Sequence, residues 1–288
     1  MTYNVTIFGI HLKLNPIAFS IPLGSRHWDI YWYGIIIATG FLLALIYAIK
    51  NAKRFGIDTD RMLDIVLVVA PVAILSARTY YVIFDGEKLN GIGDFFGFGD
   101  SSGFSGIAIY GGVIGAFVSG FLMCKIRKVN FRDMFDLASL GFLIGQGVGR
   151  WGNFVNQEAY GSFTNSSFWG MQSERTIREM GEGLVHPCFL YESVWCIAGF
   201  FIINHLSRNR KFSGETFLMY CGWYGFGRGF IELLRTDSLM LGSIKVSCLL
   251  AFVLCIASVT AIILIRKKLK PEEGYVSQFS ENAEEENV

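Results

Sequence analysis

The sequence predicts an all-α, polytopic membrane protein of about seven transmembrane helices, with its N-terminus outside the cytoplasm and its C-terminus inside. Composition is the first observation: the 288 residues are 52% hydrophobic and only 17% charged, whereas soluble domains carry about 25% charged residues. Patterning is the second: apolar runs with few charges alternate with polar loops, and Lys/Arg clusters follow every second run. Both place the chain in a membrane. The net charge of +1 says nothing about nucleic acid, because the positive charges are partitioned by topology and form no single basic face, so no nucleic-acid partner is implied.

Residues 1–29 are too polar and too interrupted by proline for a spanning helix, so we expect an N-terminal arm on the membrane surface. The first apolar run, 30–49, is uncharged and has about the 20 residues that cross roughly 30 Å of hydrocarbon. Aromatic residues open it, as is typical at a membrane interface. Six further runs are expected to span the bilayer: 65–84, 106–124, 134–149, 188–205, 216–234 and 244–265.

Basic clusters follow the first, third, fifth and seventh runs, and the positive-inside rule places these clusters in the cytoplasm. The membrane domain is therefore expected at 30–265, and its largest polar excursion, 150–187, on the outer face. Residues 266–288 begin with a basic cluster and end in an acidic stretch, so we expect a disordered cytoplasmic tail.

Charged residues within the runs or at their ends need compensation and by default indicate a functional site. Four of them lie where simple solvation does not explain the charge: Arg78, Arg150, Arg228 and Glu232. Arg228 and Glu232 share one helix face at i, i+4, and Arg235 follows at i+7. Glu232 is either an orienting partner for an arginine or a catalytic group, and Arg78 fits a structural ion pair as well as a site. Arg150 and Arg228, facing one space, require an anion between them, and their planar forks suit a phosphate.

Glycines are dense in the third and fourth runs, which fits close helix packing as well as broken backbone that lines a cavity. Tyr110, which precedes Gly111 and Gly112, either projects a phenol into that space or merely packs. The six cysteines show no metal-ligand spacing and the four histidines form no cluster. We therefore expect neither a metal nor a cofactor.

Five segments, in order, resemble the motifs of the prolipoprotein diacylglyceryl transferase family. Residues 149–158, GRWGNFVNQE, resemble its signature GRxGNFxNxE. The other four segments are WYG at 32–34, IYGGVIG at 109–115, HPCFLYE at 186–192 and YGFGRGFIELLR at 224–235.

The resemblance implies a transferase of the bacterial cytoplasmic (inner) membrane that acts in lipoprotein maturation, with its active site toward the outer face. Such an enzyme moves the diacylglyceryl group of phosphatidylglycerol onto the lipobox cysteine of a prolipoprotein signal peptide, forming a thioether and releasing glycerol phosphate. The substrate supplies the thiol, so the enzyme needs no catalytic cysteine.

The resemblance also implies roles for individual residues. Arg150 and Arg228 match arginines that would stabilise the departing phosphate. The further residues implied are Asn153, Asn156 and Glu158, which would hold the headgroup or brace the arginines, Tyr33 and Tyr224, which would line the lipid pocket, and Gly152, Arg235 and His186.

One position departs from the family pattern: many members carry a histidine where this chain has Tyr110. A histidine takes up a proton near neutral pH, whereas a tyrosine of ordinary pKa, about 10, is mainly a hydrogen-bond donor there. The acceptor of the thiol proton therefore stays open among Glu232, Tyr110, the leaving phosphate and water.

Three other classes of protein fit the sequence less well. A seven-helix receptor shares the topology but gives no reason for the charges within the runs. A transporter or channel would use such arginines for an anion pathway, and predicts solute flux without a protein thiol. An intramembrane protease needs a Ser and His pair or paired aspartates within spans, and no histidine lies in a suitable run.

Overall fold

The computed structural model describes residues 2–23, 26–85, 95, 108–236, 240–241 and 244–269. The predicted loop after the second run and nearly all of the predicted tail fall outside these ranges. The chain divides into two compact units, one formed by Met1–Ala48 with Asp136–Val288 and the other by Ile49–Phe135. Each unit is described by itself below.

The described chain is mainly α-helical, which confirms the predicted class. Its long helices are α1 (Trp32–Asn51), α2 (Thr59–Asp85), α4 (Ile109–Ile126), α5 (Phe131–Val155), α7 (Cys188–Leu206), α8 (Glu215–Leu234) and α9 (Val246–Lys268). Among the described residues, five of these, α1, α2, α4, α7 and α9, are long and apolar enough to cross a membrane. The other two, α5 and α8, carry Arg150 and Arg228, so the charges that indicate a site also lower the apolar character of their helices.

The fourth predicted run ends at Gly149, but α5 continues to Val155, so its predicted end was wrong. The continuation is amphipathic. Trp151 and Phe154 pack their rings against Phe189 of α7, with centroids 5.7 and 4.9 Å apart, while Asn153 between them hydrogen-bonds to polar side chains. The first part of the signature is therefore helical rather than a loop.

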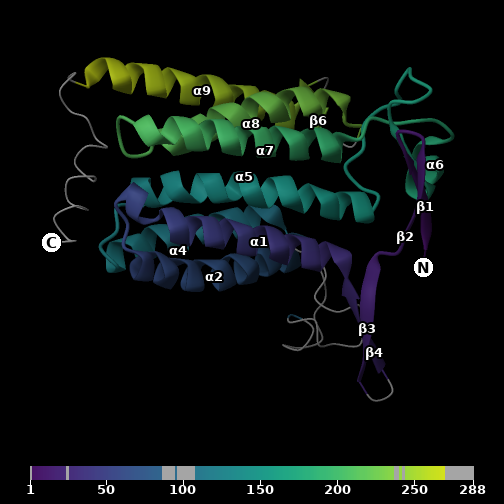
Figure 1. Ribbon diagram of the computed structural model, residues 1–288, viewed down its shortest axis with the longest axis horizontal. Coiled ribbons are helices and arrows are strands. Elements are labelled where there is room, and N and C mark those ends of the chain that lie inside the picture. Colours follow the sequence, from purple (N-terminus) through teal and green to yellow (C-terminus); the bar gives the residue numbers. More distant parts are fainter. Residues whose placement is uncertain are drawn as a thin grey trace. The chain divides into compact units, whose positions relative to one another are not determined.

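Helices α7, α8 and α9 lie side by side in the first unit (Figure 1). Trp195 of α7 and Trp223 of α8 stack with centroids 4.2 Å apart, and each indole Nε1 donates to the other residue's carbonyl, at 2.9 and 3.0 Å. Gly227 and Gly199 make room, since a Cβ on either would overlap an indole ring. This reciprocal pair fixes α8 against α7.

In the second unit α4 packs closely on α2. A Cβ on Gly111 or Gly115 would overlap Ser76, so these glycines permit the contact. The geometry confirms that these glycines serve close helix packing.

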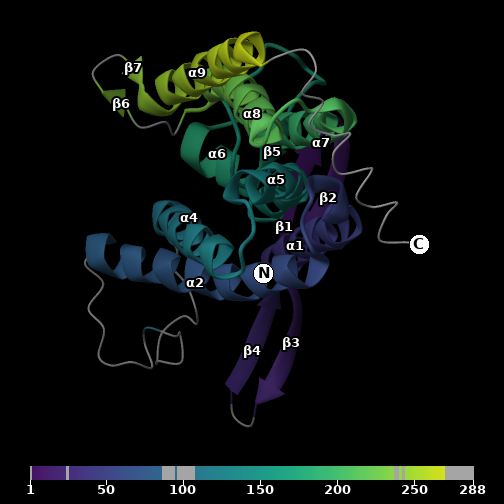
Figure 2. The same ribbon diagram turned by 90° about the vertical axis from the view of Figure 1, so that its left-hand side faces the viewer.

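The N-terminal arm forms strands. They are β1 (Tyr3–Ile7), β2 (Ile10–Leu14), β3 (Ile17–Leu23) and β4 (Arg26–Tyr31). The β3–β4 hairpin leads directly into α1 and extends away from its start (Figure 2). Strand β1 pairs with β2 and with β5 (Met171–Ser173), which lies in the excursion and precedes the short helix α6 (Glu174–Met180).

A small apolar core lies beneath this sheet and joins it to the helices. Val5 and Met171 from the strands meet Phe154 at the end of α5 and Phe189 at the start of α7. The core therefore holds together the ends of the two helices that carry the signature and the HPCFLYE segment. The remaining short elements are the turns η1 (Lys53–Phe55) and η2 (Ser207–Asn209) and the strands β6 (Met240–Leu241) and β7 (Ile244–Lys245).

Candidate active site

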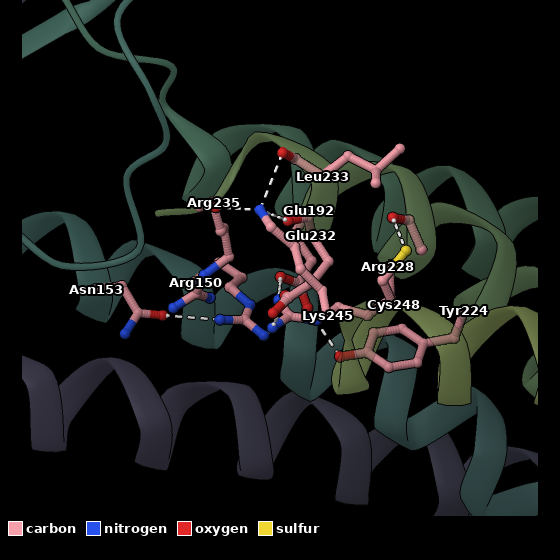
Figure 3. A network of polar contacts seen from close by, with 11 residues as sticks. Arg150, Asn153, Glu192, Tyr224, Arg228, Glu232, Leu233, Arg235, Lys245 and Cys248 are labelled. Atoms are coloured by element: carbon pink, nitrogen blue, oxygen red, sulfur yellow. Dashed lines mark hydrogen bonds and ion pairs between the residues drawn. The ribbon is translucent and has the colours of Figure 1, made fainter. Parts of the chain in front are cut away.

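The centre of the site is the carboxylate of Glu192, which lies near the start of α7 and is 2% exposed. Arg150 on α5 donates from Nη2 to its Oε1 at 2.5 Å, and Arg228 on α8 donates from Nη1 to its Oε2 at 2.8 Å. Tyr224 donates its hydroxyl to Oε1 at 2.9 Å. Three helices thus meet at one carboxylate whose two oxygens are both occupied (Figure 3).

Glu232 supplies a second carboxylate on α8. Its Oε2 lies 2.6 Å from Arg228 Nη2, the i, i+4 pairing that the sequence predicts. The contact is an ion pair without hydrogen-bond geometry, since this oxygen accepts no hydrogen bond in the part of the chain that the structure describes. Two guanidiniums and two carboxylates make the cluster neutral, and the side chains of Arg150 and Arg228 keep 21% and 19% of their surface exposed.

Local packing explains why Glu192 stands between the arginines. Pro187 precedes the first residue of α7, where a missing N–H costs nothing. Ser193 then donates its hydroxyl to the carbonyl of Gly147 on α5 at 2.7 Å, and a Cβ on Gly147 would lie 2.9 Å from Ile197. The two helices are thus held closely together, with Glu192 facing Arg150.

A second row of polar contacts runs from Arg150 into the excursion. Arg150 Nη1 donates to Asn153 Oδ1 at 3.4 Å, and Asn153 Nδ2 donates to Glu158 Oε2 at 3.3 Å. Glu158 Oε1 pairs in turn with Arg175 Nη1 at 3.4 Å. The predicted residues Asn153 and Glu158 therefore brace an arginine of the site.

The outer end of this row is anchored on α6. Arg175 donates from Nε to Glu179 at 2.8 Å, and this hydrogen bond raises the pKa of the Arg175 guanidinium. The hydroxyl of Tyr160 and then Arg175 donate to Glu179 and lower the pKa of its carboxyl. Gln157, buried and at a φ of 57°, accepts the backbone N–H of Arg175 at 3.0 Å. The signature thus also caps α6.

Tyr33 and Gly152 meet as a pair. Tyr33 is the second residue of α1, and a Cβ on Gly152 would lie 2.8 Å from its ring. Glycine at this position therefore allows α1 to approach α5 about half a turn beyond Arg150.

Arg235 ends α8 with an extended backbone, and its carbonyl accepts Lys245 Nζ at 2.5 Å. Asn156 closes the last turn of α5 through its backbone N–H, which donates to Gly152 at 3.1 Å. His186 lies apart from the Glu192 contacts: its Nδ1 is 3.1 Å from the hydroxyl of Tyr191. The structure thus places His186 in the loop before α7, beside Tyr191.

Tyr110 and Arg78 belong to the second unit. Tyr110 is the second residue of α4 and is 66% exposed. Arg78 on α2 is buried; its Nε donates to the carbonyl of Phe95 at 3.1 Å, and its guanidinium lies over the ring of Tyr81. These contacts lie within that unit and favour a structural role for Arg78.

Sequence reasoning did not single out Glu192 or Lys245, which contact predicted residues of the candidate site. Glu192 was visible as a carboxylate inside an apolar run and within the HPCFLYE segment. That signal is of the same kind as the one that singled out Arg228 and Glu232. Lys245 carries no comparable signal, because a lysine at the start of a predicted span is typical of a membrane interface.

Comparison with known proteins finds a family model, prolipoprotein diacylglyceryl transferase, that matches residues 16–264. Similar curated proteins include three called phosphatidylglycerol–prolipoprotein diacylglyceryl transferase. The Clostridioides difficile protein is 40% identical over 84% of this chain and 93% of its own length. The Bacillus cereus strain B4264 protein is 42% identical over 89% and 95%. The Listeria welshimeri protein is 38% identical over 94% and 96%.

Proposed function

The chain belongs to the prolipoprotein diacylglyceryl transferase family, and we propose that it transfers the diacylglyceryl group of phosphatidylglycerol to prolipoproteins by clamping the lipid phosphate between Arg150 and Arg228. The supporting observation is the convergence of both guanidiniums, from separate helices, on the single carboxylate of Glu192. We take the acceptor to be the lipobox cysteine of a precursor signal peptide.

The reaction forms one bond and breaks one. The thiolate sulfur attacks the glyceryl carbon that bears the phosphate, the carbon–oxygen bond breaks, and glycerol phosphate leaves with the bonding electrons. Negative charge grows on the phosphate oxygens, so preorganised cations lower the barrier, each donor contributing about 3 kcal/mol in comparable sites. Arg150 and Arg228 are held in place before lipid binds, because Glu192 fixes both.

The clamp can accept a phosphate without losing its brace. A guanidinium has five N–H donors, and the contacts described for Arg150 and Arg228 use two N–H-bearing nitrogens of each. Both side chains are partly exposed, and further donors of each fork suit the oxygens of a phosphate. Glu192 then keeps the two cations together while the lipid phosphate binds their open side.

The two carboxylates differ in their capacity to take the thiol proton. Glu192 already accepts three hydrogen bonds, so we assign it to bracing. Among the residues that the structure describes, Glu232 Oε2 has only its ion pair with Arg228, which makes Glu232 the better acceptor of the two. Tyr110, the leaving phosphate and water are the other acceptors that the chemistry allows.

We further propose seven membrane spans in the bacterial cytoplasmic membrane, with the N-terminus and the site toward the outer face and the C-terminus in the cytoplasm. Support comes from basic residues in the last turns of α1, α4 and α9, where an inner membrane face would hold them. Precursor cysteines emerge at the outer face after translocation, so the clamp would lie where its substrate arrives.

A peptide assay tests the proposed reaction. Purified protein is incubated with phosphatidylglycerol vesicles and a lipobox peptide, and mass spectrometry should find the diacylglyceryl mass on the peptide cysteine. A peptide with serine for that cysteine is the control. Arg150→Ala and Arg228→Ala should abolish transfer with folding retained, and lysine at either position should restore only part of it, because a point charge does not reproduce the fork. Folded wild-type protein without adduct contradicts the assignment.

A further inference from the structure

We propose that Lys245 is a positioning residue of the transferase, whose ammonium group closes the C-terminal end of α8 and thereby fixes Arg228 and Glu232. The inference rests on the proposed function, because it concerns the geometry of the same clamp. Lys245 lies just before α9 and contacts the end of α8 (Figure 3).

The ammonium group of Lys245 donates to three backbone carbonyls. Its Nζ lies 3.0 Å from the oxygen of Glu232, 3.1 Å from that of Leu233 and 2.5 Å from that of Arg235. The carbonyl of Leu234 accepts the backbone N–H of Ser162 at 2.7 Å. A helix end leaves its last carbonyls without partners from a following turn. Here a lysine side chain and one excursion N–H supply partners, and the carbonyl of Glu232 also accepts the backbone N–H of Arg235 at 3.2 Å.

An ammonium group suits this place for two reasons. Its three donors match three acceptors, and its positive charge lies at the C-terminal, negative end of the α8 dipole. Carbonyls left without a donor at this partly buried helix end would destabilise the last turn. We therefore expect that turn to fray when the ammonium group is removed.

Fraying would reach the clamp through Glu232. Its carbonyl is held by Lys245, while its carboxylate lies 2.6 Å from Arg228. One turn earlier, Cys248 Sγ donates to the carbonyl of Gly229 at 3.5 Å, so the start of α9 holds α8 at a second point. Lys245 thus acts on Arg228 through the backbone of Glu232.

This arrangement distinguishes Lys245 from a ligand of the lipid. All three of its donors are engaged by backbone, so it offers none to a phosphate. Its loss should misplace the clamp and slow the chemical step, whereas the loss of a lipid ligand would raise KM. The kinetic constants therefore separate the two roles.

The test uses full-length protein and the peptide assay. For Lys245→Met we expect kcat to fall about tenfold or more, since small misplacements of a catalytic group are costly, while KM for phosphatidylglycerol changes less than about twofold. Lys245→Arg should recover most of kcat. Lys267→Met, which removes an exposed charge at the other end of α9, should match wild type.

Hydrogen exchange gives a readout besides turnover. Backbone amides of residues 233–235 should exchange faster in Lys245→Met than in wild type, and Lys245→Arg should restore protection. Lys245→Gln, which keeps a donor, replaces the methionine variant if that variant does not fold.

Three results overturn the inference: unchanged kcat in Lys245→Met, a raised KM with unchanged kcat, or an arginine variant no better than methionine. Wild-type protein without transfer would instead contradict the proposed function itself.

Discussion

At the scale of single residues, the carboxylate of Glu192 allows two arginines to lie in one site. Without this carboxylate, Arg150 and Arg228 would repel each other whenever no lipid phosphate was bound between them. The buried carboxylate neutralises one charge and gives each guanidinium a fixed direction. The clamp is therefore formed by the chain itself and does not depend on the lipid for its geometry.

Replacement of Glu192 by glutamine tests this role. The variant keeps the shape but removes the charge, so two partly buried cations face an amide whose N–H groups repel one of them. Removing one partner of a buried ion pair typically costs about 3–5 kcal/mol. Because the arginines are partly exposed, we expect roughly 2 kcal/mol less stability and about 100-fold lower kcat/KM. Thermal unfolding in detergent and the peptide assay measure both.

An added anion provides the control for that prediction. Inorganic phosphate or phosphatidylglycerol should raise the Tm of Glu192→Gln more than that of wild type, since it supplies the missing negative charge. Glu192→Asp, which keeps the charge, should show a smaller loss of activity. Equal stabilisation of both proteins by phosphate would argue against a phosphate site between the arginines.

At the scale of elements, the helices of the site are positioned by close contacts that the sequence only partly indicates. Glycine density pointed to close packing, and Gly111 and Gly115 fulfil that expectation in the second unit. The reciprocal pair of Trp195 and Trp223 was not foreseen, because it depends on two glycines from different helices. Gly227, which packs against Trp195, is also the residue before Arg228, so a residue needed for helix packing is adjacent to one of the candidate site.

Gly227→Ala should therefore reduce stability and activity together. Its Cβ would overlap the Trp195 indole, and overpacking of this kind costs about 1–3 kcal/mol. The matched control is Gly145→Ala on α5, where nothing lies within 4 Å of the added Cβ. That change should be neutral or stabilising by up to about 1 kcal/mol, because alanine favours helix. Tm measurements on both variants check the opposite signs.

Hydropathy predicted the positions of the helices well, but it predicted neither the end of α5 nor the strands of the N-terminal arm. The first and fifth runs differ from α1 and α7 by two residues or fewer. The end of α5 was missed because Arg150 and Asn153 look like loop residues until Glu192 and Glu158 pair with them. The arm sheet depends on β1 pairing with β5, far away in sequence, and local pattern does not show such a partner.

At the scale of the whole molecule, the first unit brings together segments that are distant along the chain. The arm strands and the excursion pack in one core with the end of α5 and the start of α7, and α5, α7 and α8 together supply the polar contacts at Glu192. The sequence motifs identified most residues of the candidate site, since each motif lies at a helix end. They did not identify the anion between the arginines or the lysine at the end of α8, because those contacts exist only after the helices pack.

The number of spans turns on whether α5 and α8 cross the membrane, and α5 can be tested directly. A protease site inserted after Gly181, which is exposed with open space around it, reports on the excursion. A second site, inserted after Lys128 in the turn before α5, is the matched control. Only α5 is long enough to cross a bilayer between them. In intact spheroplasts we expect added protease to cut at the first site and spare the second until lysis. Equal access at both would mean that α5 does not span, since its two ends would share one side, and the charges of Arg150 and Glu192 would then need a different environment from the one proposed.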